Sequence, residues 1–290
     1  MVPRAVLVER PSEFEELLAR HATREQVRFF LEQRGRSVHE VETRHARQQE
    51  HHRIVLGAVP PDWRTAVVAR GDLDRFLFEP VDVVLALGQD GLIANVAKYL
   101  DAQPVIGLNP DPEHVAGVLV KHPPQAAPDL IADVAAGRAS VEQRTMVEAR
   151  LDDGQAVTAL NEVFVGHASH QSARYTFQVG GRSERQSSSG LIVATGTGAT
   201  GWAASINRAV GLALPEPCDG RLAYFVREAW PSIATGTSLT AGIVDRLAIV
   251  CELGEGGVVF GDGIEADRVA VDWGQRVEIG ASSRTLRLVE

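Results

Sequence analysis

The feature that most constrains the fold is a change in the pattern of apolar runs about 110 residues into the chain. Before that point, short apolar runs at 5–8, 65–68, 81–87 and 104–108 alternate with segments of helical pattern. The runs are continuously apolar or β-branched, as expected of strands that are buried on both faces. Strands that alternate with helices predict a parallel α/β sheet over this part of the chain.

Beyond that point, short strands are separated by glycine-containing turns, among them Asp153-Gly154 and Gly180-Gly181. Such turns are typical of antiparallel hairpins. One helix is expected near 202–210. We therefore predict an α/β nucleotide-binding domain over residues 1–113 and a β-rich, sandwich-like substrate domain over residues 114–290. The last ~15 residues are candidates to return to the first domain.

Composition argues against several classes of partner. The net charge of −9 at pH 7 disfavours broad binding to nucleic acid or to an anionic membrane. The cysteines, Cys218 and Cys251, do not make a disulfide framework or a close-spaced metal pair. The N-terminal residues have no apolar leader, and no run approaches the ~20 apolar residues of a membrane helix. These observations predict a cytoplasmic protein without a membrane or nucleic-acid partner.

The turn at 88–91, Gly-Gln-Asp-Gly, directly follows the apolar run 81–87. Ligands of open α/β sheets bind at this carboxyl end of the strands. Asp90 could therefore accept a proton from a sugar hydroxyl or help to hold a metal. The alternative is that Asp90 only caps the helix that follows.

A second glycine-rich turn, 196–201, lies between the apolar run 191–194 and the expected helix. It matches G-x-G-x-x-G, but the surrounding sequence is hairpin-like and lacks the second parallel strand of a dinucleotide fold. The pattern instead predicts a helix N-terminus with outward-facing hydroxyls from Thr195, Thr197 and Thr200. Anionic or hydroxyl-rich ligands bind at such helix ends.

Asn161 and Glu162 interrupt an otherwise apolar strand. Adjacent strand residues point to opposite faces, so one of the two faces a core unless it is paired. Either a ligand or a bulged edge strand explains this pattern. Trp202, beside the second glycine-rich turn, is either a core residue or a platform on which a purine stacks.

For His167 and His170 the sequence leaves open whether they bind anything, and for Asp262 it predicts no chemistry. His167 and His170 form an H-x-x-H pair without further obvious ligands, which is seldom a metal site. Asp262, between two glycines, is expected to lie in a hairpin turn.

Taken in order, four segments of the chain resemble the motifs of the NAD kinase family. They are GQDG (88–91), GLN (107–109), ALNEVFVG (159–166) and SSGLIVATGTGATGW (188–202). The segment 104–113 and the TGTG turn are similar to the mitochondrial-type branch in particular. The likeness extends over most of the chain and is weakest over residues 210–290.

This resemblance implies an α/β domain, a β-rich domain and a site in the cleft between them. The implied enzyme is a transferase that moves the terminal phosphate of ATP, with Mg²⁺, to the 2′-hydroxyl of the adenosine ribose of NAD, giving NADP. It implies that Asp90 is the general base and that Asn161 and Glu162 hold ribose hydroxyls. It also implies a homodimer or homotetramer that binds small-molecule nucleotides.

The family pattern further implies which residues line the nucleotide site. Thr200, Gly201 and Trp202 correspond to the adenine and ribose pocket, and Ser189 lies where most members carry an aspartate near the nicotinamide. The other positions implied to bind nucleotide are Gly88, Gln89, Gly91, Asn109, Thr197, Gly198 and Ser205.

Gln89 stands where the family motif has its second glycine. If that position requires a positive φ, a residue other than glycine costs about 1 kcal/mol and crowds the phosphate donor. The donor, ATP or polyphosphate, therefore stays open. So do two alternative functions: a kinase of this fold for another hydroxyl acceptor (a nucleoside, sugar or lipid), and a non-catalytic relative that binds NAD(P).

Overall fold

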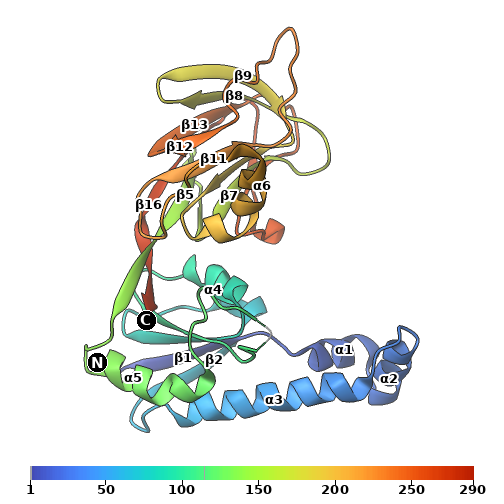
Figure 1. Cartoon of the computed structure of the whole chain (residues 1–290), viewed down its shortest axis with the longest axis vertical. Helices are drawn as coiled ribbons and strands as arrows, with labels where there is room; N and C mark the ends of the chain where they lie inside the picture. Colours follow the sequence, from blue (N-terminus) through green and yellow to red (C-terminus); the bar gives the residue numbers. More distant parts are fainter. Residues whose placement is uncertain (1, 114) are drawn as a thin grey trace. The chain divides into compact units, whose positions relative to one another are not determined.

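The structure, a computed structural model, describes residues 2–113 and 115–290. The chain forms two compact units: a first unit of Met1–Glu142 with Arg287–Glu290, and a second unit of Gln143–Leu286 (Figure 1). The expected boundary after residue 113 lies before this division. The reason is that α5 (Ala127–Ala135) packs into the core of the first unit, where it buries Ile131.

The first unit is built on a parallel sheet, as the apolar runs predicted. Its strands lie in the order β2-β1-β3-β4, followed by the end of β16. They are β1 (Arg4–Glu9), β2 (Arg64–Ala69), β3 (Asp82–Leu87), β4 (Pro104–Leu108) and β16 (Arg276–Val289). The central strands are buried on both faces, which explains why β3 is apolar at every position after Asp82.

Helices cover this sheet and extend beyond it. They are α1 (Glu13–His21), α2 (Arg24–Glu32), α3 (Val38–Gly57), α4 (Asp90–Ala97) and α5, with short 3₁₀ helices η1 (Arg70–Arg75) and η2 (Pro124–Ala126). Helices α1 and α2 and the start of α3 form a lobe to one side of the sheet, with a small core of its own around Val27, Leu31 and Val41 (Figure 1). None of the helices within residues 2–113 and 115–290 combines the length and apolar character needed to cross a membrane.

The second unit contains antiparallel strands that enclose one core, as the hairpin pattern predicted. One set comprises β5 (Val141–Leu151), β6 (Ala156–Ala159), β8 (Ala173–Val179), β9 (Arg182–Ser188), β13 (Arg246–Cys251) and most of β16. The other sheet has the order β12-β11-β10-β7-β14-β15. Its strands are β7 (Glu162–His167), β10 (Leu191–Ala194), β11 (Leu222–Val226), β12 (Ala241–Val244), β14 (Gly257–Gly261) and β15 (Val269–Val271). Side chains such as Phe177, Ile249 and Val163 fill the space between the two sets.

The predicted helix of this unit, α6 (Trp202–Val210), covers the other face of the six-stranded sheet. It follows the 3₁₀ turn η3 (Gly198–Thr200), and a further turn, η4 (Glu265–Asp267), follows β14. Side chains alternate along a strand, so Val163 of β7 points into the inter-sheet core and Phe164 points to the α6 side. Glu162 lies on that same α6 side.

Candidate functional site

In the second unit, hydrogen bonds tie the glycine-rich turn to the bend that precedes β7. The Thr195 hydroxyl donates to the Leu160 carbonyl at 2.6 Å, and the Thr195 N–H donates to the Asn161 carbonyl at 2.9 Å. The same hydroxyl accepts the N–H groups of Thr197 at 3.1 Å and Gly198 at 3.2 Å. One buried side chain thus fixes both segments that carry predicted site residues.

Two glycines of this turn are needed because backbone segments approach each other closely there. A Cβ atom on Gly198 would lie 2.2 Å from the Asn161 carbonyl oxygen, and one on Gly196 would lie 2.0 Å from the Glu216 carbonyl oxygen. A Cβ atom on Gly201, by contrast, would have no neighbour nearer than 3.7 Å. The glycines at 196 and 198 therefore pack backbone against backbone.

The threonine hydroxyls of the turn do not all face outward, so that expectation was wrong. Thr195 is completely buried and Thr197 is 2% exposed, whereas Thr200 is exposed. The Thr197 hydroxyl has no hydrogen-bond partner among the described residues, and the Thr200 hydroxyl donates to the Thr197 carbonyl at 3.1 Å. Tertiary packing, and not the local turn, decides which hydroxyl is accessible.

Glu162 is a buried carboxylate in the middle of the sheet. Strand β7 pairs with β10 on one side and β14 on the other, which excludes the edge-strand interpretation of Asn161-Glu162. Glu162 is 7% exposed, and no hydrogen-bond donor approaches its carboxylate from the part of the chain that is described. Burial, and then the negative charge of Asp262, raise its pKa to about 7. A ligand hydroxyl would supply the donor that this carboxylate lacks.

Asp262 positions the bend before β7, a role that the sequence analysis missed. Its Oδ2 accepts the Leu160 N–H at 3.0 Å and its Oδ1 accepts the Asn161 N–H at 2.7 Å. Its own N–H donates to the Glu162 carbonyl at 2.9 Å, and its φ of 52° is left-handed. The partners are about a hundred residues apart in sequence, so the Gly-Asp-Gly turn gave no local signal of this contact.

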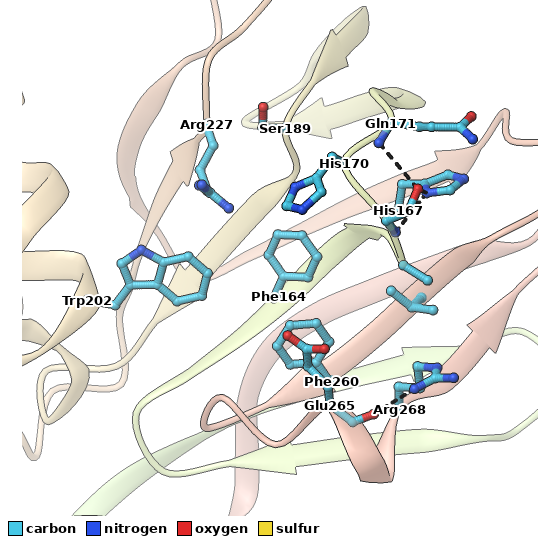
Figure 2. Close-up of a pocket in the computed structure, with 13 residues that line it drawn as sticks. Phe164, His167, His170, Gln171, Ser189, Trp202, Arg227, Phe260, Glu265 and Arg268 are labelled. Atoms are coloured by element: carbon cyan, nitrogen blue, oxygen red, sulfur yellow. Dashed lines mark hydrogen bonds between the residues drawn. The ribbon is translucent and has the colours of Figure 1, made fainter. Parts of the chain in front are cut away.

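A pocket of about 460 Å³ opens on the α6 side of the sheet, and it is lined by Phe164 but not by Glu162 (Figure 2). The rings of Phe164 and Trp202 are nearly parallel, with centroids 6.1 Å apart and 14° between their planes, and Phe260 lies 4.9 Å from Phe164. The Arg227 guanidinium carbon lies 5.2 Å from the centre of the Trp202 ring. The predicted residue Ser189 also lines this pocket. Aromatic faces with an adjacent cation suit a planar heterocycle that bears phosphate.

His167 and His170 line the same pocket. The Nδ1 atom of His167 accepts the N–H of Ser169 at 3.0 Å and lies 2.9 Å from the Ser169 hydroxyl. Within the described parts of the chain, no three His, Cys, Asp or Glu side chains gather so that they could hold a metal ion.

In the first unit, Asp90 is the first residue of α4 and is half-buried. Its two oxygens accept hydrogen bonds from three consecutive backbone N–H groups: Val118 at 2.9 Å, Leu119 at 2.8 Å and Val120 at 3.1 Å. The alternative that Asp90 caps the helix is wrong, because the N-cap is Gln89 and no side chain caps that end. A carboxylate has about four acceptor positions, so one remains on Oδ2.

The glutamine in this turn causes no backbone strain. Gln89 has φ −112° and ψ 167°, an extended conformation that any residue adopts. The cost of about 1 kcal/mol that the sequence analysis attached to a positive φ is therefore absent. Gly88 is more constrained, since a Cβ atom there would lie 3.0 Å from Leu92 Cδ2, while Gly91 faces open space.

Asn109, at the end of β4, is 4% exposed and holds the loop that follows. Its Nδ2 donates to the Val115 carbonyl at 2.8 Å, and its Oδ1 accepts the Asp111 N–H at 3.0 Å. These bonds use both ends of the carboxamide within the loop. Nucleotide binding by Asn109 stays a prediction.

The predicted site residues are divided between the two units. Gly88–Gly91 and Asn109 belong to the first unit, and the other predicted residues belong to the second. In the second unit the structure brings Asn161 and Glu162 against the glycine-rich turn. Ser205 is exposed on α6 and does not line the pocket beside Trp202.

Curated proteins with similar sequences are NAD kinases, although no protein-family model matches the chain. The NAD kinase of Methylococcus capsulatus is 34% identical over 44% of this chain and 46% of its own length. Human mitochondrial NAD kinase 2 is 30% identical over 49% of this chain and 42% of its own length. The NAD kinase of Chlorobaculum tepidum is 28% identical over 44% of this chain and 46% of its own. The chain spans about half the length of the curated relatives that it matches.

Two solved structures share the fold over nearly the whole chain. An NAD kinase from Archaeoglobus fulgidus in complex with ATP has a TM-score of 0.59 and 19% identity, covering 99% of this chain and 93% of that one. Yeast NADH kinase complexed with NADH has a TM-score of 0.60 and 16% identity, covering 100% of this chain and 84% of that one. The resemblance to the NAD kinase family that the ordered motifs predicted is therefore confirmed, in sequence by the curated relatives and in fold by these structures.

Proposed function

We propose that this protein is an NAD kinase, which transfers the terminal phosphate of ATP to the 2′-hydroxyl of the adenosine ribose of NAD and yields NADP. The observation that carries the proposal is the buried Glu162 carboxylate, which has no donor among the described residues and lies on the same face of β7 as Phe164, a residue that lines the aromatic pocket. A buried carboxylate with a vacant acceptor costs free energy that a ribose hydroxyl would offset.

The second unit supplies binding for the adenosine in this proposal. Glu162 accepts a hydrogen bond from one ribose hydroxyl, and Asn161 forms a hydrogen bond with the adjacent ribose hydroxyl. The backbone of Asn161 is held in place by Thr195 and Asp262. The heterocycle stacks on Trp202 within the pocket that Phe164 also lines. These contacts orient the ribose and contribute to catalysis by positioning it.

Asp90 accepts the proton of the attacking hydroxyl. As the bond from the ribose oxygen to the terminal phosphorus forms, the bond from that phosphorus to the ADP oxygen breaks, and the proton passes to Oδ2 of Asp90. The three backbone N–H groups at 118–120 hold the carboxylate in one orientation and leave that acceptor position open. Mg²⁺, bound by the phosphates of ATP, would neutralise the charge of the donor.

The experiment that tests these roles compares NADP formation by Asp90→Asn with that of the wild type. We expect the rate to fall by about a hundredfold or more, because the amide cannot accept the proton. The amide also has only one acceptor oxygen, so part of the 118–120 contact is lost and the melting temperature falls. Asp62→Asn, which changes an exposed aspartate of the same unit, is the control and should leave the rate unchanged.

NAD affinity, measured by calorimetry on both variants, separates lost chemistry from lost folding. We expect Asp90→Asn to bind NAD with an affinity within a few-fold of that of the wild type. If Asp90→Asn forms NADP at the wild-type rate, Asp90 is not the group that accepts the proton.

A further inference from the structure

The carboxyl edge of the first unit's sheet carries two arginines that the proposed mechanism does not use. In the register of the sheet, the last residue of β1, Glu9, lies opposite the last residues of both β2 and β3. The residues that follow these three strands are Arg10, Arg70 and Gly88. They therefore lie along one edge, with Arg10 in the middle.

This edge contains the switch point of the sheet. From β1 the chain adds β2 on one side, then crosses back to add β3 and β4 on the other side. The reversal lies between β1 and β3, and the crevice outside such a reversal is where open α/β sheets bind ligands. Arg10 and Gly88 flank it.

The side chains of Arg10 and Arg70 are positive groups that no carboxylate engages directly in the described part of the chain. Among the described residues, neither guanidinium forms a hydrogen bond or an ion pair with a carboxylate, whereas Arg4 and Arg24 of the same unit both do. Burial and then the like charge of Arg10 lower the pKa of Arg70, and the charge of Glu16 opposes this shift. An anion between the two arginines would offset the repulsion between their charges.

The acidic groups around these arginines are mostly engaged by other partners. The 3₁₀ helix η1, which begins at Arg70, packs against α4, and α4 begins directly after the glycine-rich turn. The Glu9 carboxylate is engaged by His52 at 3.0 Å, and the Asp90 carboxylate by the backbone of 118–120. Glu16 is the remaining acidic group that acts on Arg70.

We propose that Arg10 and Arg70 bind the terminal phosphates of the nucleoside triphosphate donor, next to the turn at Gly88–Gly91. The proposal rests on the proposed function, since it assigns the donor of that reaction to residues of the first unit. Guanidinium groups form paired hydrogen bonds with phosphate oxygens, and the glycine at 88 allows a close approach of the backbone.

Steady-state kinetics of Arg10→Gln and Arg70→Gln test this assignment in the active enzyme. Each substitution should raise the KM for ATP by about tenfold and leave the KM for NAD unchanged. Arg75→Gln is the matched control, because it removes a charge from the other end of η1. An ATP KM that stays at the wild-type value in both variants would overturn the proposal.

Calorimetric titration with inorganic tripolyphosphate tests the same site without turnover. The wild type and Arg75→Gln should bind it, and Arg10→Gln and Arg70→Gln should bind about tenfold more weakly at unchanged melting temperature. Failure of the wild type to bind, or affinities within twofold for all four proteins, would contradict the phosphate site. If Arg10→Gln and Arg70→Gln lose tripolyphosphate binding but the wild type forms no NADP, the phosphate site is supported and the proposed kinase activity is refuted.

Discussion

At the scale of single residues, Glu162 is the most informative side chain. It lies in a central strand, is 7% exposed and is acted on by the negative charge of Asp262. Its ionised form is therefore penalised by burial and by a like charge. A residue in this state is retained at a cost in stability, which is typical of a group that serves a ligand.

This cost predicts how stability depends on pH. The pKa of Glu162 is about 7 in the folded protein, above the unfolded value of 4.5. Its contribution to the free energy of unfolding is therefore fully present below pH 4.5 and is lost as the pH rises through 7. Glu162→Gln removes this titration, so its free energy of unfolding relative to the wild type should rise by about 2.5 kcal/mol between pH 5 and pH 8. Urea unfolding at both pH values measures this, with the exposed Glu255→Gln as control. If the difference in unfolding free energy between Glu162→Gln and the wild type does not change with pH, Glu162 does not have a raised pKa in the folded protein.

At the scale of elements, the site of the second unit depends on how the turn after β10 meets the bend before β7. The contact between these two segments requires the buried Thr195 hydroxyl, the Asp262 carboxylate and the absence of a side chain at Gly198. These three features hold Asn161 and Glu162 in fixed positions, which reduces the entropy cost of binding a ribose.

Gly198→Ala tests this arrangement. The new Cβ atom would lie 2.2 Å from the Asn161 carbonyl oxygen, so the two segments must separate. We expect a loss of about 1–3 kcal/mol in the free energy of unfolding and weaker binding of NAD. Gly254→Ala is the control, because a Cβ atom there meets no neighbour within 4 Å. Equal stability and NAD affinity in Gly198→Ala and the wild type would show that the contact is not required.

At the scale of the whole molecule, the fold was predictable because apolar runs and turn residues are local signals. The parallel sheet of the first unit and the antiparallel strands and α6 of the second follow from them. The order of the motifs also indicated Glu162 and Trp202. Homo-oligomerisation, cytoplasmic location and the need for Mg²⁺ stay predictions.

Other parts of the site were not predictable, because they depend on contacts between distant segments. Asp262 reaches the backbone of Asn161 across about a hundred residues, and the partners of Asp90 are backbone N–H groups, which carry no side-chain signature. The burial of Thr197 follows from tertiary packing and not from its turn. Local reasoning therefore found the residues but not their partners.

The most direct test of the account is an acceptor panel. The purified protein is incubated with ATP, Mg²⁺ and either NAD, a nucleoside, a sugar or a lipid alcohol, and both ADP and NADP are measured. We expect ADP and NADP in equal amounts with NAD, and no ADP above background with the other acceptors. Consumption of ATP with another acceptor and not with NAD, or binding of NAD that never yields NADP, would contradict the proposed function.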